Sequence, residues 1–236
     1  MDKHSSTAPL PPDMPRERFL AQGAASLSDA ELLAVLLRSG VHGAPVLALA
    51  EELLASHDRS LLSLSTATPE ELSKLHGMGM AKSIGLAAAF ELGRRMVRLR
   101  LETQPKITSP TLISEYIRSI LPTSTQEEFH ALLLDARLQF IKDIRITIGL
   151  VDRSLVHARE VFRAAIHDAA SGIILTHNHP SGDVQPSKED VTTTKYLIEA
   201  GEIIGIRIID HVIVATPPKR DQPAYYSFKE HKLLYE

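Results

Sequence analysis

The strongest constraint on the fold is a change in hydrophobic periodicity after the first hundred residues. Before that point apolar residues recur with helical spacing, as in the run Leu32–Leu37, and no strand-like alternation interrupts them. Helix-start patterns, Ser28-Asp-Ala-Glu31 and Thr68-Pro-Glu-Glu71, precede two of these stretches. Residues 16–100 are therefore predicted to form a small helical bundle, and the polar, proline-rich residues 1–15 a disordered tail.

Beyond this region the pattern becomes mixed. The segment Leu99–Thr111 loses helical periodicity and contains two prolines, which places the domain boundary there. Strands are predicted at 128–135 and 139–146 (a hairpin), around 154–157, at 173–176 and at 206–215, with helices at 112–121, 161–170 and 188–204. Gly205 suits the C-cap of the last helix. This order predicts an α+β protein whose second domain, residues 101–236, has a mostly antiparallel sheet flanked by helices.

Composition limits the classes of site and partner. The chain has no cysteine, so a transition-metal site must use histidine and carboxylate ligands. Its net charge of −3 argues against nucleic-acid binding by the whole surface, so any DNA contact must be a local patch. The arginine-rich stretch Gly93–Arg100 is one candidate, although such cations are also typical of a solvated helix C-terminus. Without a bilayer-length apolar run or a signal-peptide core, we expect a cytoplasmic protein with no membrane partner.

The stretch Thr176–Asp190 carries the chemistry. His177 and His179 are the only histidines at i, i+2 spacing, and on an extended backbone both side chains point to one face. A helix capped by Ser187 would place Asp190 in its first turn, and the intervening Pro/Gly loop can fold that turn back over the strand end. Two imidazoles and a carboxylate with a fourth position open form the arrangement of a catalytic zinc site. Taken separately, Ser-x-x-Asp is also a plain helix cap, and histidines at a strand end are often exposed polar residues.

The sequence HNHPSGDVQPSKED (His177–Asp190) resembles the His-x-His-x7-Ser-x-x-Asp signature of the JAMM (MPN+) metalloproteases. The proline after the second histidine is more narrowly similar to the bacterial RadC family (UPF0758 type), and the similarity continues through residues 15–40, 154–162 and 199–214. The resemblance implies a helix-hairpin-helix domain followed by an α/β JAMM/MPN domain of cytidine-deaminase-like fold. It also implies one Zn²⁺ per chain, held by His177, His179 and Asp190 with a water completing the shell.

The resemblance also implies roles for neighbouring residues. JAMM enzymes take a general base from a glutamate on an upstream strand, and the matching residue is Glu160 in the sequence HARE. An acidic residue there is also typical of a charge that favours a helix N-terminus. Ala158 stands where the family often has proline, a departure expected to alter a turn. Ser187 would donate to a developing oxyanion and also cap its helix. Other nearby histidines have no spacing that ties them to the metal and are predicted to be structural or to support its ligands: His157, His167 and His211.

A smaller motif lies in the helical half. LHGMGMAKS (Leu75–Ser83) joins two helices through Gly77 and Gly79, which permit positive φ and leave backbone N–H groups uncovered for a phosphate. Lys82 adds a charge. The turn resembles the helix-hairpin-helix motif that contacts DNA backbones, although Ser83 stands where that motif more often has alanine. A tight turn without a ligand is the alternative.

Together these features predict a zinc-dependent hydrolase, a JAMM-type metallopeptidase that cleaves an amide or isopeptide bond in a protein or peptide. The alternative is a DNA-binding, repair-associated protein whose metal site is structural or inactive. No segment of the sequence identifies the substrate.

Overall fold

The computed structural model describes residues 14–40, 43, 45–121, 125–148, 156–219 and 222–234. The chain divides into two compact units, unit 1 (Met1–Glu91) and unit 2 (Leu92–Glu236). This division falls inside the long helix α6 (Met80–Glu102), before the proline-containing segment in which the sequence places the boundary. Most of the predicted tail, and Ser154 and Leu155 of the strand predicted around 154–157, lie outside the described residues. The end of that strand is described: His157 is the N-cap residue of a helix.

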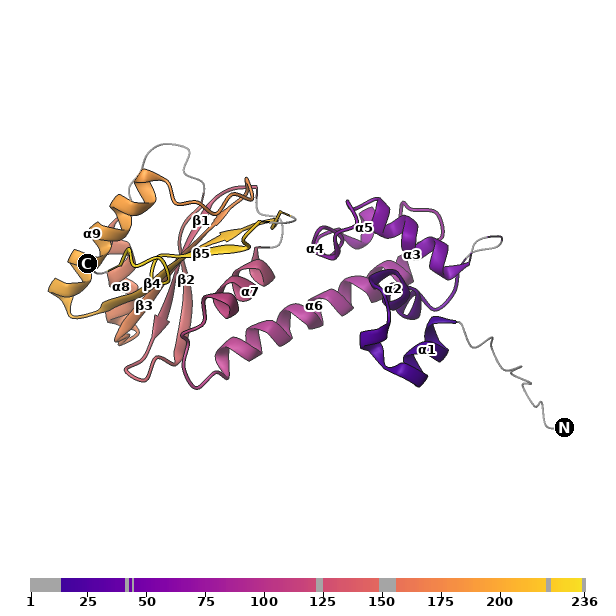
Figure 1. The fold of residues 1–236 in the computed structure, drawn as a ribbon, viewed down its shortest axis with the longest axis horizontal. Coiled ribbons are helices and arrows are strands. Elements are labelled where there is room, and N and C mark those ends of the chain that lie inside the picture. Colours follow the sequence, from indigo (N-terminus) through magenta and orange to yellow (C-terminus); the bar gives the residue numbers. More distant parts are fainter. Residues whose placement is uncertain are drawn as a thin grey trace. The chain divides into compact units, whose positions relative to one another are not determined.

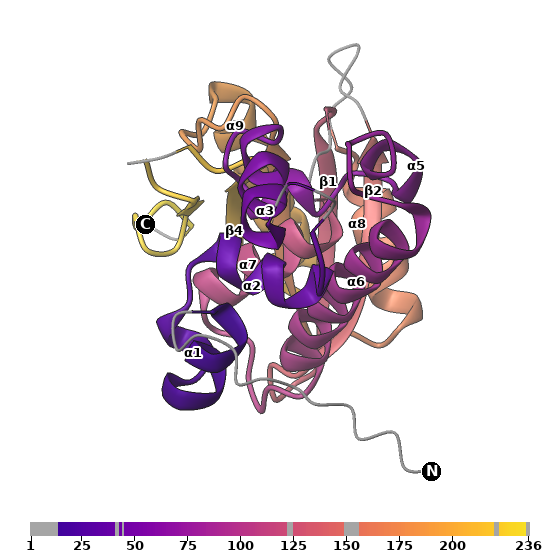
Figure 2. The same ribbon diagram turned by 90° about the vertical axis from the view of Figure 1, so that its right-hand side faces the viewer.

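Unit 1 is helical, as its periodicity predicts, and its helices are labelled in Figure 2. They are α1 (Pro15–Gln22), the 3₁₀ helix Ala24–Ser26, α2 (Asp29–Leu37), α3 (Val46–Ala55), α4 (Leu61–Leu64), α5 (Pro69–Leu72) and the start of α6. Both predicted helix starts form complete capping boxes. The Ser28 N–H donates to Glu31 at 2.8 Å, and the Thr68 N–H donates to Glu71 at the same distance. Each box satisfies N–H groups that a helix start leaves unpaired.

Unit 2 contains, in its described residues, a five-stranded sheet in the order β2-β1-β3-β4-β5 (Figure 1). Its elements are α7 (Pro110–Ile120), β1 (Glu128–Leu134), β2 (Phe140–Ile148), α8 (Ala158–His167), β3 (Gly172–His179), α9 (Lys188–Ile204), β4 (Arg207–Ala215) and β5 (Tyr225–Ser227). Neighbouring strands pair antiparallel except β3 and β4, which are parallel. The predicted mixed sheet, mostly antiparallel and flanked by helices, is confirmed.

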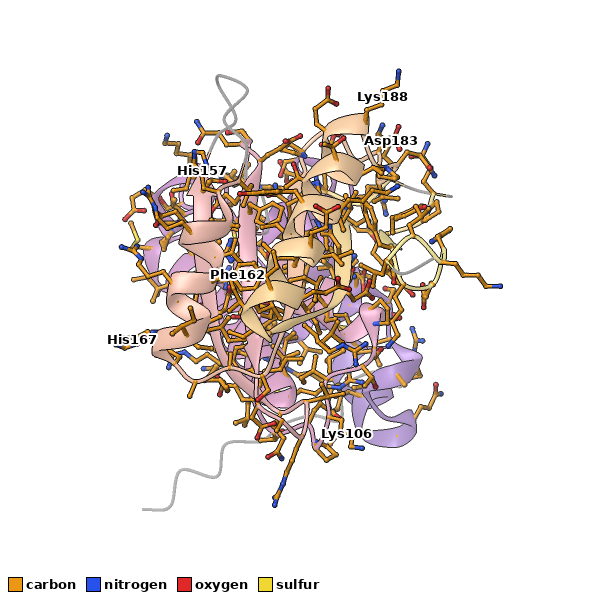
Figure 3. The ribbon with its side chains drawn as sticks, turned by 90° about the vertical axis from the view of Figure 1, so that its left-hand side faces the viewer. Lys106, His157, Phe162, His167, Asp183 and Lys188 are labelled. Atoms are coloured by element: carbon orange, nitrogen blue, oxygen red, sulfur yellow. The ribbon has the colours of Figure 1, made fainter. Side chains whose placement is uncertain are left out.

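Helices cover both faces of this sheet because side chains alternate along the buried strands. On one face Phe129, Ala131 and Leu133 of β1 belong to a core that includes residues of α8 and α9. On the other face Leu132 and Leu134 belong to a core that includes α7. Figure 3 views the first face, with α8 and α9 in front of the strands.

Helices α8 and α9 approach closely at Gly201. A Cβ atom there would lie 3.2 Å from the ring of Phe162, which is buried in α8 (Figure 3). Replacing such a buried phenylalanine by alanine costs about 3–5 kcal/mol. This contact packs the C-terminal end of α9 against α8.

The strand β3 lies between β1 and β4 and extends through both histidines of the motif, three residues further than predicted. Helix α9 begins at Lys188 and ends at Ile204, as predicted, and its C-cap is Gly205, whose φ of +83° is the left-handed conformation that glycine adopts readily. Figure 3 shows Asp183 and Lys188 near the start of α9, at the same end of the sheet as His157, with His167 at the opposite end of α8. None of the described helices is long and apolar enough to cross a bilayer.

Candidate metal centre

Three side chains of the motif converge at the end of β3. The Nε2 atoms of His177 and His179 are 3.0 Å apart, and the Asp190 carboxylate approaches them at 3.2 Å (His177) and 3.8 Å (His179). Among the described residues, these three are the group whose ligand atoms, all within 4.8 Å of one another, could hold a metal ion. The i, i+2 spacing brings the two rings to one face, as predicted, and the first turn of α9 supplies the carboxylate.

The donor set fits a divalent transition metal. Two nitrogens bound to one tetrahedral zinc at about 2.0–2.1 Å lie about 3.3 Å apart, close to the separation of the two histidine nitrogens. Two imidazoles and one carboxylate are also the ligand types that zinc uses in catalytic sites with an open position.

Ser187 orients Asp190 as well as capping α9. Its hydroxyl accepts the Asp190 N–H at 3.0 Å and donates to Asp190 Oδ2 at 2.7 Å, and its N–H donates to the same oxygen at 2.7 Å. Burial acts to raise the pKa of the Asp190 carboxyl, but the hydrogen bond and charge of His177 and the bonds from Ser187 outweigh it and hold that pKa well below its usual range. Oδ2 is therefore engaged by Ser187, while Oδ1 faces His177.

The structure does not bring Glu160 to this cluster. Glu160 lies in the first turn of α8, where its carboxylate contacts Arg159 at 3.1 Å and Arg163 at 2.9 Å. It is absent from the described residues that line the cleft beside the metal ligands. Its position matches the alternative interpretation, a charge at a helix N-terminus.

Another glutamate, which no pattern in the sequence indicates, lies on the face of the sheet that carries His177 and His179. The ring of Phe129 stacks on His177, and these residues are paired across β1 and β3. Because side chains alternate, Glu127 shares the face of Phe129, and continuing the antiparallel register places it opposite His179. Glu127 lines the cleft.

The backbone around Glu127 is held by Asn178, the residue between the two histidines. Asn178 is fully buried; its amide accepts the Glu128 N–H at 2.7 Å and donates to the carbonyl of Gln126 at 3.1 Å and to Thr216 at 2.9 Å. These bonds fix both neighbours of Glu127. The Glu128 carboxylate is directed elsewhere, 3.4 Å from Arg145 and 3.8 Å from His130.

A cleft of about 960 Å³ opens beside the ligands. Its described lining carries more acid than base, with Lys188 the one lysine or arginine among it. The acidic residues are Glu127, Glu128, Asp183, Glu189 and Asp190. Even with a divalent cation bound, such a lining is better suited to a neutral or cationic substrate than to a polyanion.

The three histidines that were predicted to be structural or to support the ligands, His157, His167 and His211, lie in different parts of unit 2. His211 is fully buried and touches His177, whereas His157 caps the start of α8 and His167, at the end of α8, contacts Asp168 at 2.9 Å. Burial holds the pKa of His211 well below its ordinary value, with the neighbouring His177 acting in the same direction.

Comparison with known proteins identifies the family of the chain. The RadC-like JAB domain family matches residues 107–233, which include His177, His179 and Asp190, and the UPF0758 N-terminal family matches residues 10–84. A UPF0758 protein of Desulforamulus reducens is 48% identical over 206 residues, 87% of this chain and 90% of its own. A UPF0758 protein of Bacillus cereus is 48% identical over 202 residues, covering 86% and 89%. The chain belongs to the RadC-like JAB domain family.

The mixed sheet flanked by helices is consistent with the JAB/MPN fold of this RadC-family chain.

The Gly-x-Gly turn of unit 1 lies within Leu75–Ser83. Gly77 has a φ of +85°, and the Lys82 ammonium group donates to the carbonyls of Gly77 at 3.0 Å and Ser39 at 2.6 Å. Lys82 therefore contacts the protein itself, and contact of Gly77, Gly79 and Lys82 with DNA stays a prediction.

Proposed function

We propose that this RadC-family chain is a zinc-dependent hydrolase of the JAMM type that cleaves an amide or isopeptide bond. The convergence of His177, His179 and Asp190 beside an open cleft carries the proposal. A bound zinc ion in such a site supplies Lewis acidity and lowers the pKa of water. The chain would hold it through His177, His179 and Asp190.

We assign to Glu127 the role of accepting and returning a proton, which the family resemblance implies for Glu160. It lines the cleft, faces the side of the sheet that carries His177 and His179, and is held by the Asn178 bonds to its neighbours. A general base must lie within reach of the proton that it removes, whatever its sequence context. Ser187 donates to Asp190 in this structure, so donation to an oxyanion requires its hydroxyl to turn.

The acidic lining favours a peptide over a nucleic acid as the substrate of this cleft. A phosphodiester backbone would bring negative charge against Glu127, Asp183 and Glu189, with Lys188 alone as a cationic partner in the described lining. DNA binding by unit 1, as in the alternative hypothesis, would be a separate activity.

Metal analysis and a cleavage screen test the proposal together. Purified chain, stripped and reloaded, is expected to hold one zinc, and His177→Ala is expected to hold none. The loaded protein is then incubated with libraries of linear and isopeptide-linked peptides, and cleavage is read by mass spectrometry.

Two variants test which glutamate acts as the general base. Glu127→Gln is expected to keep zinc and lose turnover by about 10²–10⁴-fold, the usual contribution of general acid–base catalysis, while Glu160→Gln retains turnover. Zinc binding without cleavage of any amide or isopeptide bond would exclude the peptidase, and absence of zinc would exclude the whole proposal. Loss of turnover in Glu160→Gln alone would return the role to Glu160.

A further inference from the structure

The two histidine ligands are anchored differently. Nδ1 of His179 contacts the backbone carbonyl of Asp183. A carbonyl only accepts, so this nitrogen carries the proton and Nε2 keeps its lone pair for a metal. Nδ1 of His177 contacts no carbonyl; it contacts Nε2 of His211 at 2.9 Å. Because a ring nitrogen either donates or accepts, this contact alone leaves the proton on His177 undefined.

A chain of hydrogen bonds shows which of these groups donate and which accept. The Thr194 hydroxyl lies 2.6 Å from the carbonyl oxygen of Asp190 and 2.6 Å from Nδ1 of His211. It has one hydrogen, which the carbonyl must receive, so Thr194 accepts from His211 and Nδ1 of His211 carries a proton.

Packing and hydrogen bonds hold His211 in place. Its ring is fully buried between Phe228, stacked at a centroid distance of 4.7 Å, and Phe129, edge-on at 5.5 Å. Its two ring nitrogens contact Thr194 and His177. When Nε2 of His177 binds a metal, the one hydrogen of that ring is on Nδ1, which donates it to Nε2 of His211.

We propose that Thr194 and His211 are positioning residues that fix the His177 ring with Nδ1 protonated, so that its Nε2 faces the metal as a ligand. This inference rests on the proposed function, since it concerns the same metal site. The relay ends on the carbonyl of Asp190, and therefore couples one ligand to the backbone of another within the first two turns of α9. Partners of this kind typically affect metal affinity by about 10–100-fold.

Zinc titration of variants tests the relay. Thr194→Val keeps the shape and removes the hydroxyl, and His211→Phe keeps an aromatic ring between Phe129 and Phe228. Each is expected to weaken zinc binding by about 10–100-fold. The double variant is expected to bind no more weakly than the poorer single variant, because both changes break one relay.

Two further variants separate the relay from a general loss of structure. Thr194→Ser restores the hydroxyl and is expected to bind zinc within about threefold of wild type, well inside the 10–100-fold effect. Thr103→Val removes a similar hydroxyl-to-carbonyl bond, 2.8 Å to Leu99, far from the ligands in the sequence, and is expected to bind as wild type does. Zinc affinity of Thr194→Val equal to that of wild type would overturn the proposal.

A spectroscopic measurement tests the proton position directly. Nitrogen-15 spectra of histidine in the wild-type protein, recorded with and without zinc, distinguish the two neutral tautomers, and His211 is identified by the signal missing in His211→Phe. We expect His211 to have a protonated Nδ1 and an unprotonated Nε2. Protonation of Nε2 instead would refute the relay even if the protein binds zinc. A protein that binds no zinc would refute the proposed function, while the tautomer would still report on the relay.

Discussion

Zinc is expected to stabilise unit 2 against thermal unfolding, and the chain contains a probe for that unit alone. All five tyrosines lie in the sequence of unit 2, and the chain has no tryptophan. Tyrosine fluorescence therefore reports the unfolding of unit 2 without a contribution from unit 1.

The size of the effect follows from the preassembled ligands. The two Nε2 atoms and Asp190 already lie together in the folded chain and are separated when it unfolds, so zinc binds the folded state preferentially. Free zinc at a hundred times its dissociation constant adds about 2.7 kcal/mol of stability. At about 2–4 °C per kcal/mol for a unit of roughly this size, the melting temperature should rise by about 5–11 °C.

Asp190→Asn is the decisive variant. The asparagine oxygen can still accept from Ser187 and keep the cap, but a neutral amide is a poor zinc ligand, so the rise should vanish. Asp168→Asn is the matched control, because Asp168 contacts Lys142 and His167 instead of the metal ligands, and it should show the full rise. An equal rise in Asp190→Asn and wild type would show that zinc stabilises unit 2 from elsewhere and would refute the reasoning.

Three further predictions concern other parts of the chain. Gly201→Ala should cost about 1–3 kcal/mol in urea unfolding followed by tyrosine fluorescence, because the new Cβ would lie 2.5 Å from the carbonyl oxygen of Ile206. Burial, with the charge and hydrogen bond of Asp143, raises the pKa of Tyr116 far above its ordinary 10.0. Tyr116→Phe should therefore leave the alkaline tyrosinate absorbance unchanged until unit 2 unfolds, and the stability that protonated Tyr116 contributes should be lost as pH rises above about 10. If unit 1 binds DNA through its Gly-x-Gly turn, Lys82→Gln should lower duplex affinity and reduce the salt slope by about 0.9.

Each of these has its own control. Gly93→Ala, where a new Cβ meets nothing within 4 Å, should change stability by no more than about 1 kcal/mol, and a similar loss in both glycine variants would remove the packing argument. A smaller absorbance rise in Tyr116→Phe than in wild type, while unit 2 is still folded, would contradict the shifted pKa. Lys106→Gln removes an equal charge, and an equal loss of DNA affinity in both lysine variants would indicate a general charge effect.

The sequence predicted features that depend on short stretches of chain. The capping boxes at Ser28 and Thr68, the C-cap at Gly205 and the convergence of His177, His179 and Asp190 each depend on residues within a short stretch of the chain. Local hydrogen bonds and side-chain alternation decide such features, so periodicity and spacing suffice to find them.

The residues that were missed depend on pairing between distant strands. Glu127 reaches the cleft because β1 pairs with β3, and no local spacing relates it to His179. The signal available was the alternation through Phe129, which becomes informative only once the strand pairing is known. Glu160, in contrast, lies close to the motif in the chain, but an intervening helix carries its side chain to Arg159 and Arg163. The strand β5 is three residues long, too short for a period-two pattern.

The placement of the ligands has a kinetic consequence. His177 and His179 belong to a strand paired on both sides within the sheet, whereas Asp190 belongs to the first turn of α9, and helix ends open more readily than central strands. Opening of that single turn withdraws the carboxylate while the imidazoles stay in place. A metal ion held by these three residues would therefore exchange with the medium at a rate set by the opening of the first turn of α9.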